Sequence, residues 1–324
     1  MLFQNKRYVF SIFDNLRTPF CVTIRTFLTP TTYHIPQTVE SATMRPLLLL
    51  LCCLEVATAF VSANRGIASS SPTQLAGGYD ATVGADPKTP IQFFTLPGNT
   101  CPYAQRTHIT LNELGLPYDV TEVTGMPKPD WYLKINPRGK VPAIRVPTAD
   151  YAVIYESAIC NEFLCDYATF MKQTQTLMPT DPFARARIRL LNDHCDNVFS
   201  KTQFTFLMNK DDSKDEELCN EMEEALQMYE DALVESKGPY LLGEDFTIAD
   251  LHLLPFIQRL VITLKHWKTY ELPTEKFPKL VKWVQSCLER DSVKESSMSR
   301  EKTIEVYSRF VEADYSFGGL NKNK

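Results

Sequence analysis

The spacing of apolar residues changes along the chain and separates two regions. Between residues 88 and 168, short runs of apolar and β-branched residues alternate with segments in which apolar residues recur every three or four positions. The elements expected from this spacing are, in chain order, a strand over 91–95, a helix over 102–114 that ends at Gly115, a strand over 118–123, a short helix over 130–134, two strands over 141–146 and 151–154, and a helix that begins near Glu156. The order β-α-β-α-β-β-α predicts a small α/β domain.

From residue 181 to residue 314 the apolar spacing is that of helices. Asp181 followed by Pro182 is typical of a helix start, and Thr247 with Asp250 forms a capping box. Further helices are expected over 216–235, 277–288 and 301–310. The sequence therefore predicts an all-α domain over 181–314, which a linker joins to the α/β domain over 88–168.

The first 87 residues differ from the rest of the chain. Residues 1–43 show no periodicity, and we expect a disordered leader or a segment that does not belong to the native protein. Residues 44–87 begin with Met44 and Arg45 and continue with a leucine run and a small-x-small signal; no acidic residue follows from 60 to 79. Such a leader is typical of a signal peptide followed by a transit-type segment, and its apolar run is too short to span a bilayer.

This leader predicts delivery to a plastid, with translation starting at Met44. A secreted protein and a cytosolic protein are the alternatives that the same residues leave open.

Composition narrows the class of protein. The chain is 44% hydrophobic and 23% charged, which is typical of a globular domain, and its net charge of −5 argues against a nucleic-acid partner. Its nine cysteines lack the spacing of a disulfide framework or of a zinc site. We therefore expect reduced thiols and no metal cofactor.

Cys101 is the strongest candidate for chemistry, because it lies between the strand over 91–95 and the helix that Pro102 opens. Unpaired N–H groups and the helix dipole favour negative charge at such a position, so we expect a thiol that ionises more easily than a free one. Position 104 is alanine, so no second cysteine follows within the motif. The alternative is a small buried cysteine without reactivity.

Five short motifs occur in order along residues 90–310. They are Cys-Pro-Tyr-Ala-Gln-Arg-Thr at 101–107, Lys-Pro-Asp-Trp at 128–131, Asn-Pro-Arg-Gly-Lys-Val-Pro at 136–142, Tyr-Glu-Ser-Ala-Ile at 155–159 and Phe-Thr-Ile-Ala-Asp at 246–250. Together they resemble the cytosolic glutathione transferases, closest to the omega class and the dehydroascorbate reductases. The resemblance implies a thioredoxin-like α/β domain that binds glutathione and an all-α domain that borders the second-substrate pocket.

The resemblance also implies roles for individual residues. Cys101 would be the catalytic residue, and Tyr103 replaces the phenylalanine usual beside it, so the local packing should survive. Val141 and Pro142 match a cis-proline turn whose Val141 amide pairs with the cysteinyl backbone of glutathione.

Three further residues match glutathione-binding positions of the family. Ser157, at a helix start, suits the γ-glutamyl carboxylate, and Glu156 suits the γ-glutamyl ammonium. Lys128 matches a lysine that approaches the glycyl carboxylate. Taken alone, each would be an ordinary turn, helix-start or surface residue.

A cysteine at position 101 favours one reaction over another. Cysteine forms a mixed disulfide with glutathione, whereas the tyrosine and serine classes activate glutathione for conjugation. We therefore expect a glutathione-dependent thiol transferase or dehydroascorbate reductase that acts on a small-molecule or protein disulfide. Glutathione is the only co-substrate implied, and the family's usual assembly is a homodimer.

Two other functions stay open at this point. One is conjugation of glutathione to electrophiles. The other is a non-catalytic relative of the intracellular chloride channel proteins, which insert a segment of the N-terminal domain into membranes. The helix after Cys101 carries Arg106, His108 and Glu113 among other polar residues, so we expect no stable membrane insertion.

Overall fold

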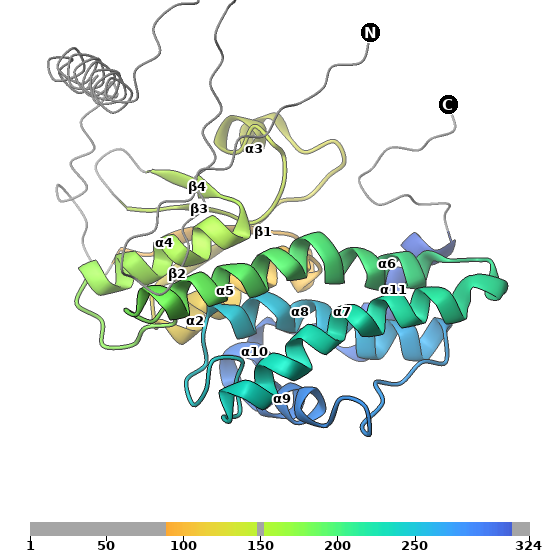
Figure 1. Ribbon diagram of the computed structural model, residues 1–324. Coiled ribbons are helices and arrows are strands. Elements are labelled where there is room, and N and C mark those ends of the chain that lie inside the picture. The colour runs from red at the N-terminus through yellow and green to blue at the C-terminus, as the bar shows by residue number, and fades with distance from the viewer. Residues whose placement is uncertain (1–88, 148–151, 313–324) are drawn as a thin grey trace, which may run out of the picture. The chain divides into compact units, whose positions relative to one another are not determined.

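The computed structural model describes residues 89–147 and 152–312 (Figure 1). The expectations for residues 1–43 and 44–87, including the signal peptide and the transit-type segment, lie outside the described residues.

Four strands form one mixed sheet in the order β2-β1-β3-β4. Their bounds are Ile91–Thr95 for β1, Tyr118–Glu122 for β2, Ala143–Arg145 for β3 and Val153–Tyr155 for β4. β1 pairs in parallel with β2, whereas β1–β3 and β3–β4 are antiparallel. β3 is shorter than the strand expected over 141–146, because Pro142 has no N–H to donate to a ladder.

Helices cover both faces of this sheet, and the alternation along β1 explains why. Phe93 belongs to the large core that includes residues of α2 (Pro102–Glu113) and α4 (Ser157–Phe170). Its neighbour Phe94 points to the other face, where it packs against Tyr132 of α3 (Asp130–Ile135). Figure 1 shows α3 on the opposite side of the strands from α2 and α4. The predicted thioredoxin-like α/β domain is confirmed.

The second part of the chain is helical, as predicted. Its helices are α5 (Pro182–His194), α6 (Ser200–Met208), α7 (Asp215–Ser236), α8 (Ile248–Trp267), α9 (Pro278–Leu288), α10 (Asp291–Ser296) and α11 (Arg300–Glu312). The sequence did not predict α10, a helix of only six residues. It also gave no sign of the π-helical turn over Cys195–Phe199, which joins α5 directly to α6.

Both predicted helix starts have the expected caps. The Asp181 carboxylate accepts from the N–H of Ala184 at 2.7 Å. The Asp250 carboxylate accepts from the N–H of Thr247 at 2.8 Å and from Nε1 of Trp283, also at 2.8 Å. Each such bond stabilises its helix by about 1 kcal/mol, so Asp250 fixes the start of α8 and ties it to α9.

α8 is the central helix of the second part, and its first thirteen residues are all buried. It contacts α2 of the α/β domain and α5, α6, α9 and α11 of its own domain. Side chains of α8 therefore lie directly beside the helix that begins at Cys101. Among the described residues, no helix combines the length and the apolar character that crossing a bilayer requires.

Candidate functional site

Cys101 is the N-cap residue of α2 and has an extended backbone (φ −89°, ψ 118°). Its Sγ lies 3.7 Å from the carbonyl oxygen of Val141, which precedes the cis peptide bond to Pro142. The backbone N–H groups of Ala104 and Tyr103 at the start of α2 lower the pKa of the thiol, although its side chain makes no capping hydrogen bond. The thiol is therefore held between the start of a helix and a proline turn that lies 40 residues later in the chain.

The pKa of Cys101 differs in direction from our expectation. Burial raises the pKa of the thiol above its ordinary value. The N–H groups of Ala104 and Tyr103 and the guanidinium groups of Arg259 and Arg106 lower it, but burial outweighs them. The expectation of an easily ionised thiol is therefore wrong, because the helix start favours the thiolate less than removal from water disfavours it.

The Val141–Pro142 turn has the geometry that the resemblance implies, with a cis peptide bond between the two residues. Val141 is half-buried, and its N–H finds no acceptor within residues 89–147 and 152–312. An extended backbone with a free N–H can pair with the backbone of a peptide ligand as an added strand does.

Glu156 and Ser157 lie at the start of α4. Ser157 is 6% exposed, and its Oγ accepts from Nη1 of Arg106 at 3.2 Å. Glu156 has a positive φ of 71°, and its carboxylate already pairs with Arg138 at 2.6 Å. The buried guanidinium of Arg106 thus fixes the hydroxyl of Ser157, while the carboxylate of Glu156 forms a solvent-exposed ion pair with Arg138.

Lys128 and Tyr103 complete the set of predicted residues. The Nζ of Lys128 donates to the carbonyl of Val123 at 3.1 Å, and burial lowers its pKa while a charge on Cys101 would raise it. The Tyr103 ring packs edge-on against Phe256 of α8, with 5.2 Å between the centroids. Burial raises the pKa of Tyr103 to about 12, so its hydroxyl stays protonated.

Sequence reasoning missed the role of Arg106. Its guanidinium is fully buried and donates to the carbonyl of His252 at 2.8 Å and to Oδ1 of Asp196 at 2.7 Å, besides Ser157. It also lies over the rings of Tyr103 and Phe256, at 5.0 Å and 4.7 Å. A signal was present, because an arginine on the buried side of a helix requires an anionic partner, but the sequence does not say which acid supplies it.

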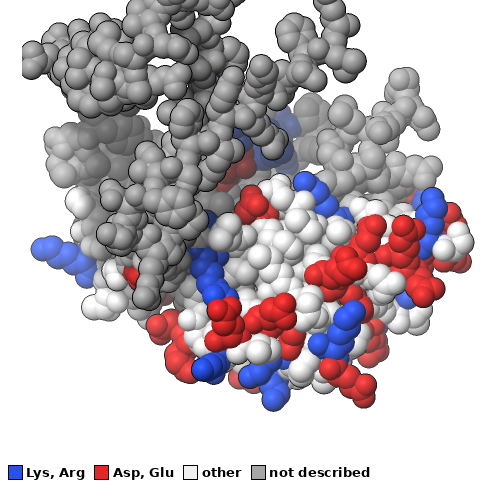
Figure 2. Space-filling model, viewed as in Figure 1, with Lys and Arg blue, Asp and Glu red and all other residues white. Residues whose placement is uncertain are grey.

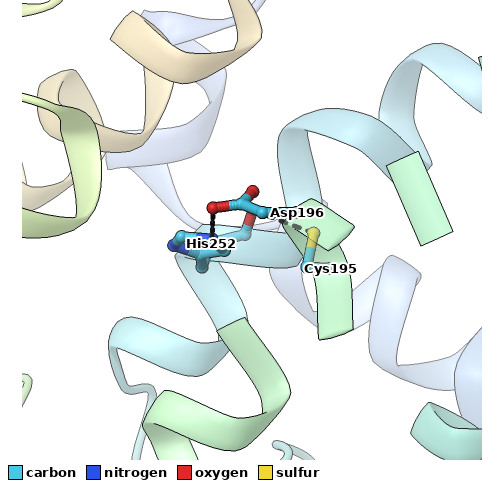
Figure 3. Close-up of side chains that lie close together, drawn as sticks. All are labelled: Cys195, Asp196 and His252. Carbon is cyan, nitrogen blue, oxygen red and sulfur yellow. Dashed lines mark hydrogen bonds and ion pairs between the residues drawn. The ribbon is translucent and has the colours of Figure 1, made fainter. Parts of the chain in front are cut away.

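Asp196 and His252 form the other side of this cluster, and Figure 3 shows the carboxylate facing the imidazole with Cys195 nearby. Nε2 of His252 lies 3.1 Å from Oδ2 of Asp196. Burial alone would raise the pKa of Asp196, but His252 and Arg106 hold it well below its usual range. Burial and the charge of Arg106 lower the pKa of His252 to about 4, so this ring is neutral at pH 7.

The same three side chains place donor atoms within 4.8 Å of one another, close enough to suggest a metal site. Arg106 argues against that use. Its guanidinium bonds to Asp196 and lies 3.5 Å from Sγ of Cys195, so a cation already neutralises the carboxylate that a metal would need.

Arg259 is a second buried cation near Cys101, and sequence reasoning missed it too. It donates to Oε1 of Gln105 at 2.6 Å and to the carbonyl of Asn99 at 3.2 Å. Across residues 89–147 and 152–312, no carboxylate pairs with it. Its charge favours the ionised forms of Cys101 and of Tyr307, so the sulfur lies in a positive field.

The other cysteines of the described ranges are free thiols. Those that are buried belong to the hydrophobic core, and burial raises the pKa of each of them: Cys160, Cys165, Cys195 and Cys287. Cys219 of α7 is half-buried.

Known proteins resemble this chain over both domains. A family model described as the N-terminal domain of glutathione S-transferase matches residues 100–166, and one for the C-terminal domain matches residues 194–291. The crystal structure of glutathione transferase Omega 3C from Trametes versicolor is 31% identical in sequence with a TM-score of 0.61, and the match covers 71% of this chain and 94% of that chain.

Two curated relatives from Oryza sativa subsp. japonica extend this comparison. The chain is 29% identical over 206 residues to "Probable glutathione S-transferase DHAR2, chloroplastic", a match that covers 63% of this chain and 68% of the relative. It is 28% identical over 215 residues to "Probable glutathione S-transferase DHAR1, cytosolic", covering 66% and 91%.

The buried imidazole of His252 leads to a prediction about acid stability. The unfolded chain binds this proton near pH 6.5 and the folded chain only near pH 4, so stability is full above pH 6.5 and falls as the pH drops toward 4. His252 alone accounts for a loss of up to about 3 kcal/mol over this range. Urea unfolding should therefore show that the free energy of unfolding decreases less between pH 7 and pH 4.5 for His252→Gln than for the wild type.

The matched control is His266→Gln, since His266 is an exposed residue of α8. The free energy of unfolding of this variant should decrease between pH 7 and pH 4.5 by the same amount as that of the wild type. An equal loss for His252→Gln would contradict a neutral, buried His252.

Proposed function

The chain belongs to the glutathione S-transferase family, and from this we propose that it is a glutathione-dependent thiol transferase or dehydroascorbate reductase of omega type that uses Cys101 as its single reactive thiol. The observation that carries the proposal is the position of the Cys101 sulfur at the start of α2, 3.7 Å from the carbonyl oxygen of Val141 in the cis-proline turn. A hydroxyl there would activate glutathione, whereas a thiol can form a disulfide with it.

We propose that glutathione binds with its cysteinyl backbone along Val141 and Pro142, beside the sulfur of Cys101. The unpaired N–H of Val141 and the 3.7 Å contact between Val141 and Cys101 support this placement. Tyr103 would border the same space with its ring packed on Phe256.

The two ends of the tripeptide would meet the remaining predicted residues. The γ-glutamyl carboxylate would meet Ser157 and the free N–H groups at the start of α4, supported by the charge of Arg106 beneath. The Glu156 carboxylate would bind the γ-glutamyl ammonium in addition to Arg138, with which it already pairs. Lys128 would approach the glycyl carboxylate.

The proposed reaction has two thiol–disulfide exchanges. The Cys101 thiolate attacks the glutathionyl sulfur of a mixed disulfide, a new S–S bond forms, and the substrate leaves as a thiolate that takes up a proton. The thiolate of a second glutathione then attacks the glutathionyl sulfur on the enzyme, which releases glutathione disulfide and restores the Cys101 thiolate. In total, the mixed disulfide and one free glutathione give the substrate thiol and glutathione disulfide, so the substrate sulfur is reduced and the sulfur of the second glutathione is oxidised.

The raised pKa of Cys101 sets a balance between two effects in this cycle. A higher pKa leaves a smaller thiolate fraction at neutral pH, but each thiolate is intrinsically more nucleophilic. The unpaired charge of Arg259 would stabilise that thiolate, and also the negative charge that develops on a substrate being reduced beside it.

Replacement of Cys101 tests this assignment. Cys101→Ser should lower the reduction of a glutathionylated peptide and of dehydroascorbate by at least about 100-fold, because serine cannot form the mixed disulfide. Cys219→Ser, at the other half-buried cysteine, should leave both rates unchanged. Undiminished turnover in Cys101→Ser, or strong aryl-halide conjugation with weak reduction in the wild type, would overturn the proposal in favour of a conjugating transferase.

We propose a plastid location on the basis of residues 44–87, and the similarity to a relative whose name includes "chloroplastic" supports it. Fusion of residues 44–87 to a fluorescent protein should direct fluorescence to plastids in a plastid-bearing cell. The fusion with 60–87 alone should not reach them. Secreted or cytosolic fluorescence from the longer fusion would refute this location.

We also propose that the protein is a homodimer. Phe183 and Leu190 of α5 are 84% and 66% exposed, and Ile159 of α4 is 59% exposed. An ion pair between Arg189 and Glu162 joins these two helices. Uncharged residues, drawn white, form a continuous stretch in the middle of the visible face in Figure 2. A second copy would cover apolar side chains that monomers rarely leave exposed together.

A charge at Phe183 should separate the two copies. Light scattering during gel filtration should give twice the chain mass for the wild type and the single mass for Phe183→Asp. Leu288→Asp, at an exposed leucine of α9, is the matched control and should keep the wild-type mass. A monomeric wild type would disprove the homodimer.

A further inference from the structure

The segment Pro97–Thr100 carries the chain from β1 to Cys101, and side chains from three other elements hold it. Nη2 of Arg259 donates to the carbonyl of Asn99 at 3.2 Å, and Oε1 of Glu122 accepts from the N–H of Gly98 at 3.1 Å. Asn99 itself has a left-handed backbone, with φ 57°. The position of the sulfur therefore depends on how firmly this short segment is fixed.

His108 holds the side chain of Asn99. Nδ1 of His108 lies 3.2 Å from Oδ1 of Asn99, and Nε2 lies 2.9 Å from the hydroxyl of Tyr118 on β2. The ring is 9% exposed and packs against Phe93, with 5.5 Å between the centroids. His108 thus lies between the sheet and the segment that precedes Cys101.

The direction of these hydrogen bonds follows from their neighbours. Tyr118 donates its proton to Oδ1 of Asn112 at 2.6 Å, so its oxygen must accept from Nε2–H of His108. Nδ1 is then free to meet Asn99 in either of two ways. A doubly protonated ring donates to the carboxamide oxygen, whereas a neutral ring accepts from the carboxamide nitrogen after a half-turn of the amide.

Charged groups around this pair come from several elements. Glu295 of α10 accepts from Nδ2 of Asn112 at 3.2 Å, and its main-chain carbonyl lies 3.5 Å from Nδ2 of Asn99. Arg259 reaches Asn99 from α8. Burial lowers the pKa of His108, which favours the neutral ring at pH 7.

We propose that His108 is a positioning residue for Cys101: through Asn99 it fixes the segment Pro97–Thr100 and keeps the sulfur aligned with the N–H groups at the start of α2. The inference rests on the proposed role of Cys101 as the reactive thiol. His108 lies seven residues after Cys101 and acts on it only through Asn99, so it is not a catalytic base.

A double-mutant cycle on the rate of Cys101 alkylation by iodoacetamide tests the proposal. Among the cysteines of residues 89–147 and 152–312, Cys101 and Cys219 are the two that are not buried. The cycle is therefore run in a Cys219→Ser background, and alkylation is followed on the peptide that contains Cys101. His108→Phe and Asn99→Gly should each slow alkylation about fivefold, the effect of one lost hydrogen bond, and the combined variant should be no slower than either. Glycine tolerates the left-handed backbone at position 99, so it removes only the side chain.

A pH series distinguishes positioning from simple packing. Asn99→Asp offers only acceptors to Nδ1, so it holds the segment only while His108 carries both protons. Its alkylation rate relative to the wild type should fall from pH 5 to pH 9 toward that of Asn99→Gly. Exposed His266 supplies the control His266→Phe, which should match the wild type throughout.

Two outcomes would overturn the positioning role. One is unchanged Cys101 alkylation in His108→Phe and Asn99→Gly, even where the melting temperature falls. The other is a combined variant whose loss equals the product of the two single losses. If His108→Phe does not fold, Asn99→Gly and the pH series of Asn99→Asp decide alone. Alkylation needs no physiological substrate, so a failure of the proposed reductase activity would be seen separately.

Discussion

The guanidinium of Arg106 is removed from water between α2, α4 and α8, and a buried cation of this kind destabilises a protein by several kcal/mol unless its donors are matched. The match comes from three separate parts of the chain: the Asp196 carboxylate, the Ser157 hydroxyl and the His252 carbonyl. Both domains must therefore be in place before the cation is satisfied. The helix that starts at Cys101 is thereby fixed relative to α4 and α8 at once.

The electrostatics around Cys101 show how burial and charge oppose each other. The helix start and the cations Arg106 and Arg259 all favour the thiolate, yet burial keeps the thiol pKa above its ordinary value. At Asp196 the balance is reversed, because His252 and Arg106 outweigh the same desolvation. The difference lies in distance: Arg106 contacts Asp196 directly at 2.7 Å, whereas no cation contacts the sulfur within a hydrogen bond in the described part of the chain.

Much of the fold could be predicted from residues that are neighbours in sequence. The start of α2 at Pro102, the cap at Asp181 and the capping box at Asp250 follow from local chemistry, and all three are present. The partnership of Arg106 with Asp196 could not be predicted, because 90 residues separate them and the packing of α2, α5 and α6 against α8 brings them together. For the same reason the sequence indicated the wrong direction for the pKa of Cys101: a motif reveals the helix start but not the depth at which it is buried.

The π-helical turn over Cys195–Phe199 has a geometric consequence for the long rod that α5 and α6 form. A wide turn contains one more residue than an α-helical turn, and one residue corresponds to a rotation of about 100°. The inward-facing stripe of α6 is thus offset from that of α5, and Asp196 stands where the offset occurs. Each of the two helices therefore presents a different set of side chains to α8. The π-helical turn between them gives Asp196 a direction that belongs to neither stripe, and there its carboxylate accepts from Arg106.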